Sequence, residues 1–244
     1  MTDRTFPDLE WLTERPIAHR GWHGGGRGPE NSLASFAAAA EAGFAIECDA
    51  HPTVDGDVVV FHDETLDRLT GETGSTRDRT IDALHGVRLA GSNETIPSLR
   101  DALDIVAGRV PIVIELKGFG ARQDGLVAAV AGALATYNGR AAIMSFDQFL
   151  VARFRTDAPG VPCGLTAEGR SEEALAAHER VAGAVDFVSY HVDALPNPFA
   201  AAFRASGRPV ITWTVRTADQ IARTRAHADQ MTFEGFGPRT LSET

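Results

Sequence analysis

Three carboxylates follow apolar runs in the sequence, and their types and spacing suit the binding of a cation. Glu47 and Asp49 stand two apart in the run 44–51, and Glu115 directly follows the run 112–114. Residues two apart on a strand share one face, so Glu47 and Asp49 are expected to point the same way. Burying such groups costs free energy unless a cation or hydrogen bonds compensate them. Three carboxylate ligands favour one hard divalent cation, Mg²⁺ or Ca²⁺, with Mn²⁺ as a further candidate. For Glu47 and Asp49 alone, salt bridges to arginine remain the alternative.

Two histidines also lie at the ends of apolar runs. His19 ends one apolar run and His62 follows another, the run 57–61. A histidine beside metal-binding carboxylates can transfer protons as a general acid or a general base. Either histidine alone would more often be structural, but two of them near three carboxylates indicate a catalytic site.

Two cations complete this set of residues. Arg20 follows His19, and Lys117, the single lysine among 23 Lys and Arg residues, shares a strand face with Glu115. A local ion pair with Glu115 is the alternative for Lys117, although an ammonium at this one position suggests that a guanidinium would not fit. Three carboxylates, one divalent ion and these two cations would sum to +1, which a phosphodiester monoanion would neutralise.

The composition limits the classes of function. The chain of 244 residues has a net charge of −10, which disfavours nucleic-acid binding because phosphate contacts need basic density. Its two cysteines cannot form a disulfide framework. The sequence shows neither a signal-peptide pattern nor a run of ~18 apolar residues. We therefore expect a cytoplasmic protein with no stable membrane association, and the sequence leaves a homodimer open.

Elements that would position these residues alternate along the chain. Short β-branched runs are predicted as strands at 16–19, 44–51, 57–61, 111–116, 141–145, 162–165, 186–190, 209–215 and 230–233. Helical patterns lie at 32–42, 98–107, 124–137, 148–157, 171–181, 199–206 and 217–226. Alternation of this kind predicts βαβ units and a parallel sheet.

One connection is too short for a parallel crossover. Asp55-Gly56 is typical of a two-residue hairpin, so the second and third strands are expected to be antiparallel, with Val54 opposite Asp57 and His62 opposite Asp49. Eight parallel strands remain, which favours a single distorted (β/α)8 TIM barrel with this hairpin after the second strand, with an open doubly wound sheet as the alternative. In such a barrel, polar residues at the carboxyl ends of strands form the site.

The rest of the chain shows no second domain. We assign residues 1–15 to an N-terminal arm that covers the bottom of the barrel or joins an interface, and residues 16–240 to the barrel domain. The segment 64–97 is rich in Gly, Thr, Asp and Arg and is expected to form a rim loop or lid with short helices.

The order of these motifs resembles the glycerophosphodiester phosphodiesterase family, in its short bacterial cytoplasmic form. The resemblance rests on His19-Arg20-Gly21, Pro29-Glu30-Asn31-Ser32, Glu47-x-Asp49, Asp55-Gly56, Val59-Val60-Phe61-His62-Asp63, Asp67-Arg68-x-Thr70, Ile96-Pro97-Ser98-Leu99, Ile114-Glu115-Leu116-Lys117 and Trp213-Thr214-Val215. It implies a distorted (β/α)8 barrel that hydrolyses glycerophosphodiesters to sn-glycerol 3-phosphate and an alcohol with a divalent metal.

The resemblance also implies roles for individual residues. His19 and His62 correspond to the general acid–base pair, with His19 assigned as base and His62 as acid. The metal ligands would be Glu47, Asp49 and Glu115, and the phosphate contacts Arg20 and Lys117. Glu30 would help to order the site, Asn31 would be a loop or cap residue, and Trp213 would line the substrate pocket. Arg216 and Glu234 depart from the usual Asn and Thr-Asp of the family, which puts the rim of the pocket in question.

Two alternatives remain at this stage. A phospholipase D-like lipid phosphodiesterase would need an apolar rim or a membrane-facing patch. A non-catalytic phosphate-binding barrel would keep the phosphate contacts without turnover. The sequence also leaves open whether water or a neighbouring glycerol hydroxyl attacks the phosphorus, and which alcohol leaves.

Overall fold

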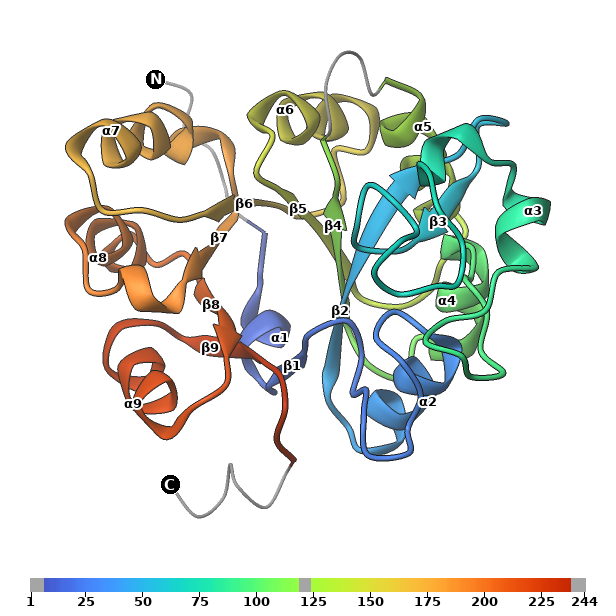
Figure 1. Cartoon of the computed structure of the whole chain (residues 1–244). Coiled ribbons are helices and arrows are strands. Elements are labelled where there is room, and N and C mark those ends of the chain that lie inside the picture. The colour runs from blue at the N-terminus through green and yellow to red at the C-terminus, as the bar shows by residue number, and fades with distance from the viewer. Residues whose placement is uncertain (1–6, 119–123, 238–244) are drawn as a thin grey trace.

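The computed structural model describes residues 7–118 and 124–237, and eight parallel strands in it close into a barrel (Figure 1). Strand β1 is hydrogen-bonded in parallel to both β2 and β9, and this double pairing closes the sheet. The barrel strands are β1 (Ile17–Ala18), β2 (Ala45–Pro52), β4 (Ile112–Leu116), β5 (Ala141–Ser145), β6 (Cys163–Ala167), β7 (Phe187–His191), β8 (Val210–Val215) and β9 (Gln230–Phe233). The predicted (β/α)8 barrel is therefore confirmed, and the open doubly wound sheet is excluded.

Helices surround this ring of strands (Figure 1). They are α2 (Leu33–Glu41), α4 (Leu99–Val106), α5 (Asp124–Leu134), α6 (Gln148–Asp157), α7 (Glu172–Val181), α8 (Pro198–Ala205) and α9 (Ala218–His227), with 3-10 turns η2 (Ala182–Ala184) and η3 (Val192–Ala194). Side chains that accept a backbone hydrogen bond cap several of them, including Ser32, Ser98 and Thr217. Within the described residues, no helix combines the length and apolarity needed to cross a bilayer.

The alternation of side chains along β2 places its carboxylates inside the barrel. Ile46, Cys48 and Ala50 belong to the large core between the sheet and the helices, whereas Ala45 packs in a separate cluster inside the barrel. Because side chains alternate between faces with period two, Glu47 and Asp49 lie on the same inner face as Ala45. The two acidic residues therefore line the axis at the carboxyl end of the strand.

The hairpin exists, but its predicted register is wrong by one residue. Strand β2 pairs antiparallel with β3 (Val58–Val60), with Ala50 opposite Val60, and the Phe61 N–H donates to the Asp49 carbonyl at 3.1 Å. Asp49 therefore faces Phe61 and not His62. The cause is Thr53, whose hydroxyl accepts the Asp57 N–H at 3.0 Å and lengthens the loop to three residues.

A three-residue loop requires a left-handed residue near its end. Gly56 supplies this conformation with φ +84°, and the Thr53 N–H closes the pair by donating to the Asp57 carbonyl at 3.0 Å. The pair Asp55-Gly56 thus predicts the hairpin correctly but not its length.

The long segment after β3 carries its own small core. It includes the 3-10 turn η1 (Thr76–Asp78) and helix α3 (Ile81–His85), so the expected short helices are confirmed. Its buried side chains pack on the far face of β3 and comprise Val59, Phe61, Leu66, Leu84, Val87, Leu89 and Ile96. This segment is folded against the barrel beside β3, which pairs with β2 outside the ring (Figure 1).

The N-terminal segment closes the end of the barrel at which the parallel strands begin. Helix α1 (Glu10–Thr13) lies over the centre of the ring in Figure 1, and Leu9, Trp11 and Leu12 pack with inward residues of the strands. These partners are Ile17, Ala45, Val113, Ala142, Met144, Phe187 and Ile211. Of the predicted arm 1–15 and domain 16–240, residues 1–6 and 238–240 lie outside the described residues.

This packing predicts that the arm contributes to stability. Leu12 is completely buried, so Leu12→Ala should remove apolar contacts, leave a cavity and lower the free energy of unfolding by about 2–5 kcal/mol. Val54, which is 63% exposed in the hairpin loop, offers a control because Val54→Ala should change it by less than about 0.5 kcal/mol. Denaturant unfolding measures both. Equal stability of the two variants would show that α1 is not part of the barrel core.

Candidate active site

Three buried carboxylates meet at the carboxyl end of the barrel. Adjacent strands β2 and β4 place Asp49 level with Glu115, and Glu47 lies one inward position earlier on β2. One oxygen from each lies within 4.8 Å of the others, and each residue is at most 8% exposed. The three residues that the sequence nominated as metal ligands are therefore brought together, and we call them the carboxylate trio.

The two nominated cations contact this trio directly. Lys117 Nζ lies 2.8 Å from Asp49 Oδ1 and 2.6 Å from Glu115 Oε1. Arg20 Nε lies 3.3 Å from Asp49 Oδ2, and the Arg20 backbone N–H donates to Glu47 Oε2 at 3.0 Å. Burial alone would lower the pKa of Lys117, but the carboxylates of Asp49 and Glu115 raise it above its ordinary value. Both cations are thus charged within the site.

The electrostatics of the trio indicate a need for more positive charge. Burial raises the pKa of Asp49, but Lys117 and Arg20 outweigh it and hold that pKa far below its usual range. For Glu47 the same two cations do not outweigh burial and the repulsion from Asp49 and Glu115, so its pKa is raised well above the ordinary value. A buried set of oxygen ligands with excess negative charge fits a hard divalent cation.

The turn after β1 brings His19 and Arg20 to the trio. Arg20 and Gly21 both adopt left-handed backbone conformations, with φ +55° and +78°. A Cβ atom at Gly21 would lie 2.3 Å from Ser35 Oγ, so only glycine fits there. This local requirement explains why glycine follows His19 and Arg20 in the sequence.

Asn31 supports the trio from the loop before α2. It is fully buried with φ +55°, a conformation that asparagine tolerates, and its Nδ2 donates to Asp49 Oδ2 at 2.8 Å. Its backbone N–H donates to the Arg20 carbonyl at 2.9 Å. We expected only a loop or cap residue at Asn31, so its contact with Asp49 is new information from the structure.

His19 is held by a carboxylate at the end of β9. Its Nδ1 lies 2.7 Å from Glu234 Oε2, and its Nε2 lies 3.9 Å from Glu47 Oε2 in the trio. The hydrogen bond from His19 is the main influence that lowers the pKa of Glu234, to about 2, and Arg216 adds a second contact at 2.8 Å. Because an ionised carboxylate only accepts hydrogen bonds, Nδ1 carries the proton and Nε2 faces the trio without one.

His62 is also held by a carboxylate through its Nδ1 atom. Its Nδ1 lies 2.6 Å from Asp63 Oδ1, so Nδ1 carries the proton of the neutral ring. Its backbone carbonyl accepts a hydrogen bond from His51 Nε2 at 3.0 Å. Burial lowers the pKa of His62, while the nearby carboxylate of Asp49 raises it. The structure thus brings His62 to the trio despite the changed hairpin register.

Glu30 holds the guanidinium of Arg20. Glu30 Oε1 accepts from Arg20 Nη1 at 2.8 Å and from Arg68 Nη2 at 2.6 Å. The predicted ordering role of Glu30 is consistent with these contacts, whereas the motif that contains Arg68 predicts no contact for it. A side chain that reaches the site from a long loop leaves no periodic signal in the sequence.

Three aromatic rings, those of Trp213, Phe146 and His191, pack together at the carboxyl ends of their strands, and we call them the aromatic wall. Trp213 on β8 donates from Nε1 to the Ser189 carbonyl at 3.1 Å, and its ring meets those of Phe146 and His191 edge to face at 5.4 and 4.8 Å. Phe146 follows β5 and is 46% exposed. Trp213 was nominated from the resemblance, and Phe146 was missed although its place after a strand end is the same signal that identified the acids.

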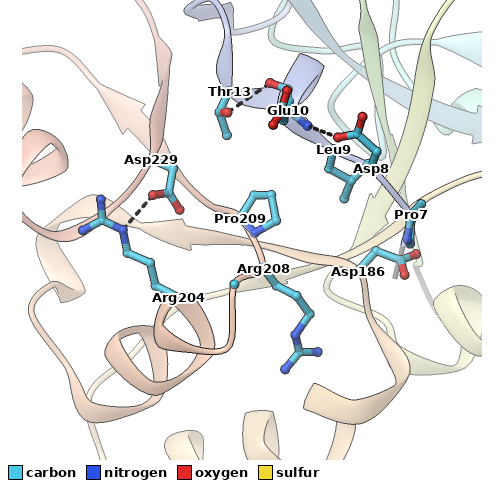
Figure 2. A pocket seen from close by; sticks show the side chains of 11 residues that line it. Pro7, Asp8, Leu9, Glu10, Thr13, Asp186, Arg204, Arg208, Pro209 and Asp229 are labelled. Atoms are coloured by element: carbon cyan, nitrogen blue, oxygen red, sulfur yellow. Dashed lines mark hydrogen bonds and ion pairs between the residues drawn. The ribbon is translucent and has the colours of Figure 1, made fainter. Parts of the chain in front are cut away.

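A cavity of about 500 Å³ lies at the opposite end of the strands, next to α1 (Figure 2). Its lining includes Arg204, which pairs with Asp229 at 2.7 Å, and Asp186, which pairs with Arg155 at 2.5 Å. No member of the carboxylate trio is among its lining residues. The cavity is therefore a junction between α1 and the barrel, separate from the candidate site.

Comparisons with known sequences point to one family. Residues 19–229 match the Glycerophosphoryl diester phosphodiesterase family. A glycerophosphodiester phosphodiesterase of Caldanaerobacter subterraneus subsp. tengcongensis is 34% identical over 161 residues, which cover 61% of this chain and 65% of the relative, slightly less than two thirds of its length. YhdW of Bacillus subtilis (strain 168) is 29% identical over 224 residues, which cover 86% of this chain and 89% of YhdW.

Solved structures share the fold. A phosphodiesterase of Oleispira antarctica, solved in complex with the product sn-glycerol-3-phosphate, has a TM-score of 0.81 with 23% identity and covers 91% of this chain and 93% of that chain. A glycerophosphodiester phosphodiesterase of Thermotoga maritima has a TM-score of 0.73 with 25% identity and covers 90% and 94%. The matched residues include every member of the site from His19 to Trp213, and the chain belongs to the Glycerophosphoryl diester phosphodiesterase family.

Proposed function

We propose that this chain hydrolyses glycerophosphodiesters to sn-glycerol 3-phosphate and an alcohol, with one divalent cation at the carboxylate trio. The observation that carries the proposal is the convergence of three buried carboxylates and two cations at the carboxyl end of one barrel, with His19 and His62 near enough to interact electrostatically with Asp49. The solved complex of the Oleispira antarctica relative with sn-glycerol-3-phosphate supports the same class of small phosphorylated ligand.

Five residues of the site would bind the metal and the phosphate. Glu47, Asp49 and Glu115 would hold Mg²⁺, Ca²⁺ or Mn²⁺, which supplies Lewis-acid polarisation of a phosphate oxygen when bound. Arg20 and Lys117 bind the phosphate and offset the charge that develops on it in the transition state.

Proton transfer falls to the two histidines. His19 removes a proton from the attacking hydroxyl, either water or the neighbouring glycerol hydroxyl, through its free Nε2. Burial, the largest influence on His19, lowers its pKa and so favours the unprotonated base. His62 acts as the acid when both of its ring nitrogens are protonated: Nε2 gives its proton to the leaving alkoxide, Nδ1 keeps its hydrogen bond to Asp63, and solvent returns a proton to Nε2 before the next turnover. Glu234 and Asp63 keep both rings oriented through Nδ1.

The aromatic wall favours a second candidate substrate. Phe146 is 46% exposed and packs against Trp213. Exposed aromatic side chains beside a site suit an apolar group on the substrate. A lysophospholipid, the substrate of a phospholipase D-like lipid phosphodiesterase, would place its acyl chain there.

One panel of substrates tests both candidates. Glycerophosphoethanolamine, glycerophosphocholine, glycerophosphoglycerol and lysophosphatidylcholine are incubated with the protein and Mg²⁺, Mn²⁺ or Ca²⁺, and release of glycerol 3-phosphate or of the free alcohol is measured. We expect metal-dependent release of sn-glycerol 3-phosphate from the glycerophosphodiesters. Cleavage of lysophosphatidylcholine alone would support the lipid phosphodiesterase instead. Binding of glycerol 3-phosphate without any turnover would support a non-catalytic barrel.

A further inference from the structure

Arg68 makes an unusually complete set of contacts for a loop residue. It lies in the segment after β3, and its guanidinium meets both oxygens of Asp63, with Nε at 2.5 Å from Oδ2 and Nη2 at 3.1 Å from Oδ1. The same guanidinium meets both oxygens of Glu30, with Nη1 at 3.1 Å from Oε2 and Nη2 at 2.6 Å from Oε1. One arginine thus binds two carboxylates, each in a bidentate manner.

Each of these carboxylates also holds a residue of the proposed site. Asp63 Oδ1 is the partner of His62 Nδ1 at 2.6 Å, and Glu30 Oε1 is the partner of Arg20 Nη1 at 2.8 Å. Arg68 is therefore the shared neighbour of the hydrogen bonds that orient His62 and Arg20. Although its side chain is 48% exposed, those of Asp63 and Glu30 are only 22% and 13% exposed, which limits the solvent screening that weakens surface ion pairs.

We propose that Arg68 is a positioning residue that couples the proton-transfer group His62 to the phosphate-binding group Arg20, an inference that rests on the proposed function. The planar fork of its guanidinium matches two carboxylates at once, which the ammonium of a lysine cannot do. Arg68 itself contacts neither His62 nor Arg20 and acts only through the two acids between them.

Removal of Arg68 has a distinct physical consequence at each carboxylate. Asp63 would lose both contacts that fix its plane, so the ring of His62 would no longer be confined to one orientation and one tautomer. Glu30 Oε2 would be released, and Glu30 could then engage Arg20 with both oxygens and draw its guanidinium away from the phosphate. The first change reduces kcat and the second raises KM.

The fold of the segment does not depend on Arg68. The segment keeps its own apolar core around Leu66 and Leu84, and backbone hydrogen bonds such as that from the Leu66 N–H to the Gly74 carbonyl at 2.9 Å. A substitution of Arg68 is therefore expected to leave the barrel and the loop folded, which thermal unfolding would verify.

A matched arginine on the same segment provides the control. Arg79 pairs with Glu72 at 2.9 Å, and both side chains are exposed and make no contact with the site residues described above. The test compares Arg68→Ala, Arg68→Lys and Arg79→Ala with the unmodified chain. It measures kcat and KM separately, guanidinium rescue at concentrations too low to unfold the protein, and the ¹⁵N resonances of the His62 ring.

We expect Arg68→Ala to lower kcat by about 10- to 100-fold and to raise KM several-fold, with partial recovery when guanidinium is added. Arg68→Lys should fall between this variant and the unmodified chain, and Arg79→Ala should match the unmodified chain. Kinetic constants for Arg68→Ala equal to those of Arg79→Ala would overturn the inference.

The ring resonances separate this inference from the proposed function, because they need no substrate. We expect His62 to carry its proton on Nδ1 in the unmodified chain and to become a mixture of tautomers in Arg68→Ala. An unmodified chain that hydrolyses no diester would refute the proposed function, whereas an unchanged Nδ1 signal in Arg68→Ala would refute the positioning role.

Discussion

Chelation of divalent cations is expected to lower the rate of glycerophosphodiester hydrolysis by about 100-fold or more, and re-addition of Mg²⁺, Mn²⁺ or Ca²⁺ is expected to restore it. The reason is the charge balance at the carboxylate trio. Lys117 and Arg20 compensate Asp49, but the pKa of Glu47 is raised by burial and by its acidic neighbours. A cation is the missing charge that would allow all three carboxylates to be ionised together.

A matched pair of variants ties this effect to the trio. Glu47→Gln keeps the size of the side chain and removes one ligand charge, so bound metal, measured by mass spectrometry of the protein after dialysis, should fall together with activity. Glu72→Gln removes an exposed carboxylate that pairs with Arg79, and it should retain both. Full activity after exhaustive chelation, with no metal detected in the unmodified chain, would contradict the proposed metal dependence.

The alternation of elements made the barrel predictable, because most of its parallel strands are short apolar runs followed by a helical pattern. The hairpin register was not predictable in the same way. It depends on the Thr53 hydroxyl, which satisfies the Asp57 N–H and adds one residue to the loop. Helix α1 (Glu10–Thr13) is a single turn, too short to leave a periodic pattern, although the apolar residues around it indicated a cap on the barrel.

The site likewise contains residues that the sequence predicted and contacts that only the structure could show. Glu47, Asp49 and Glu115 follow apolar runs, so their strand positions alone predicted that they converge. The partner of His19 could not be found this way, because Glu234 lies 215 residues away and meets it only when β9 closes the ring beside β1. Its departure from the family pattern was visible, and so was that of Arg216, but their joint contact required the structure.

Substitution of either histidine is expected to have the other large effect. His19→Ala and His62→Ala should each lower kcat by about 10²- to 10⁴-fold, because each removes one proton-transfer step. The double variant should lose less than the product of the two single losses, since the two groups act in one reaction. His85 provides the control, because it pairs with Asp101 at 3.2 Å on the surface and His85→Ala should leave kcat unchanged.

The leaving group of the substrate distinguishes the acid from the base. An alkoxide such as that of ethanolamine needs a proton as it departs, whereas the anion of p-nitrophenol is stable without one. With glycerophospho-p-nitrophenol, His62→Ala should therefore recover most of the lost rate if His62 is the acid, and His19→Ala should not recover. The reverse pattern would exchange the two assignments. Equal and complete loss with both substrates would instead mean that the two histidines act before the leaving group departs, in binding the phosphate or in activating the nucleophile.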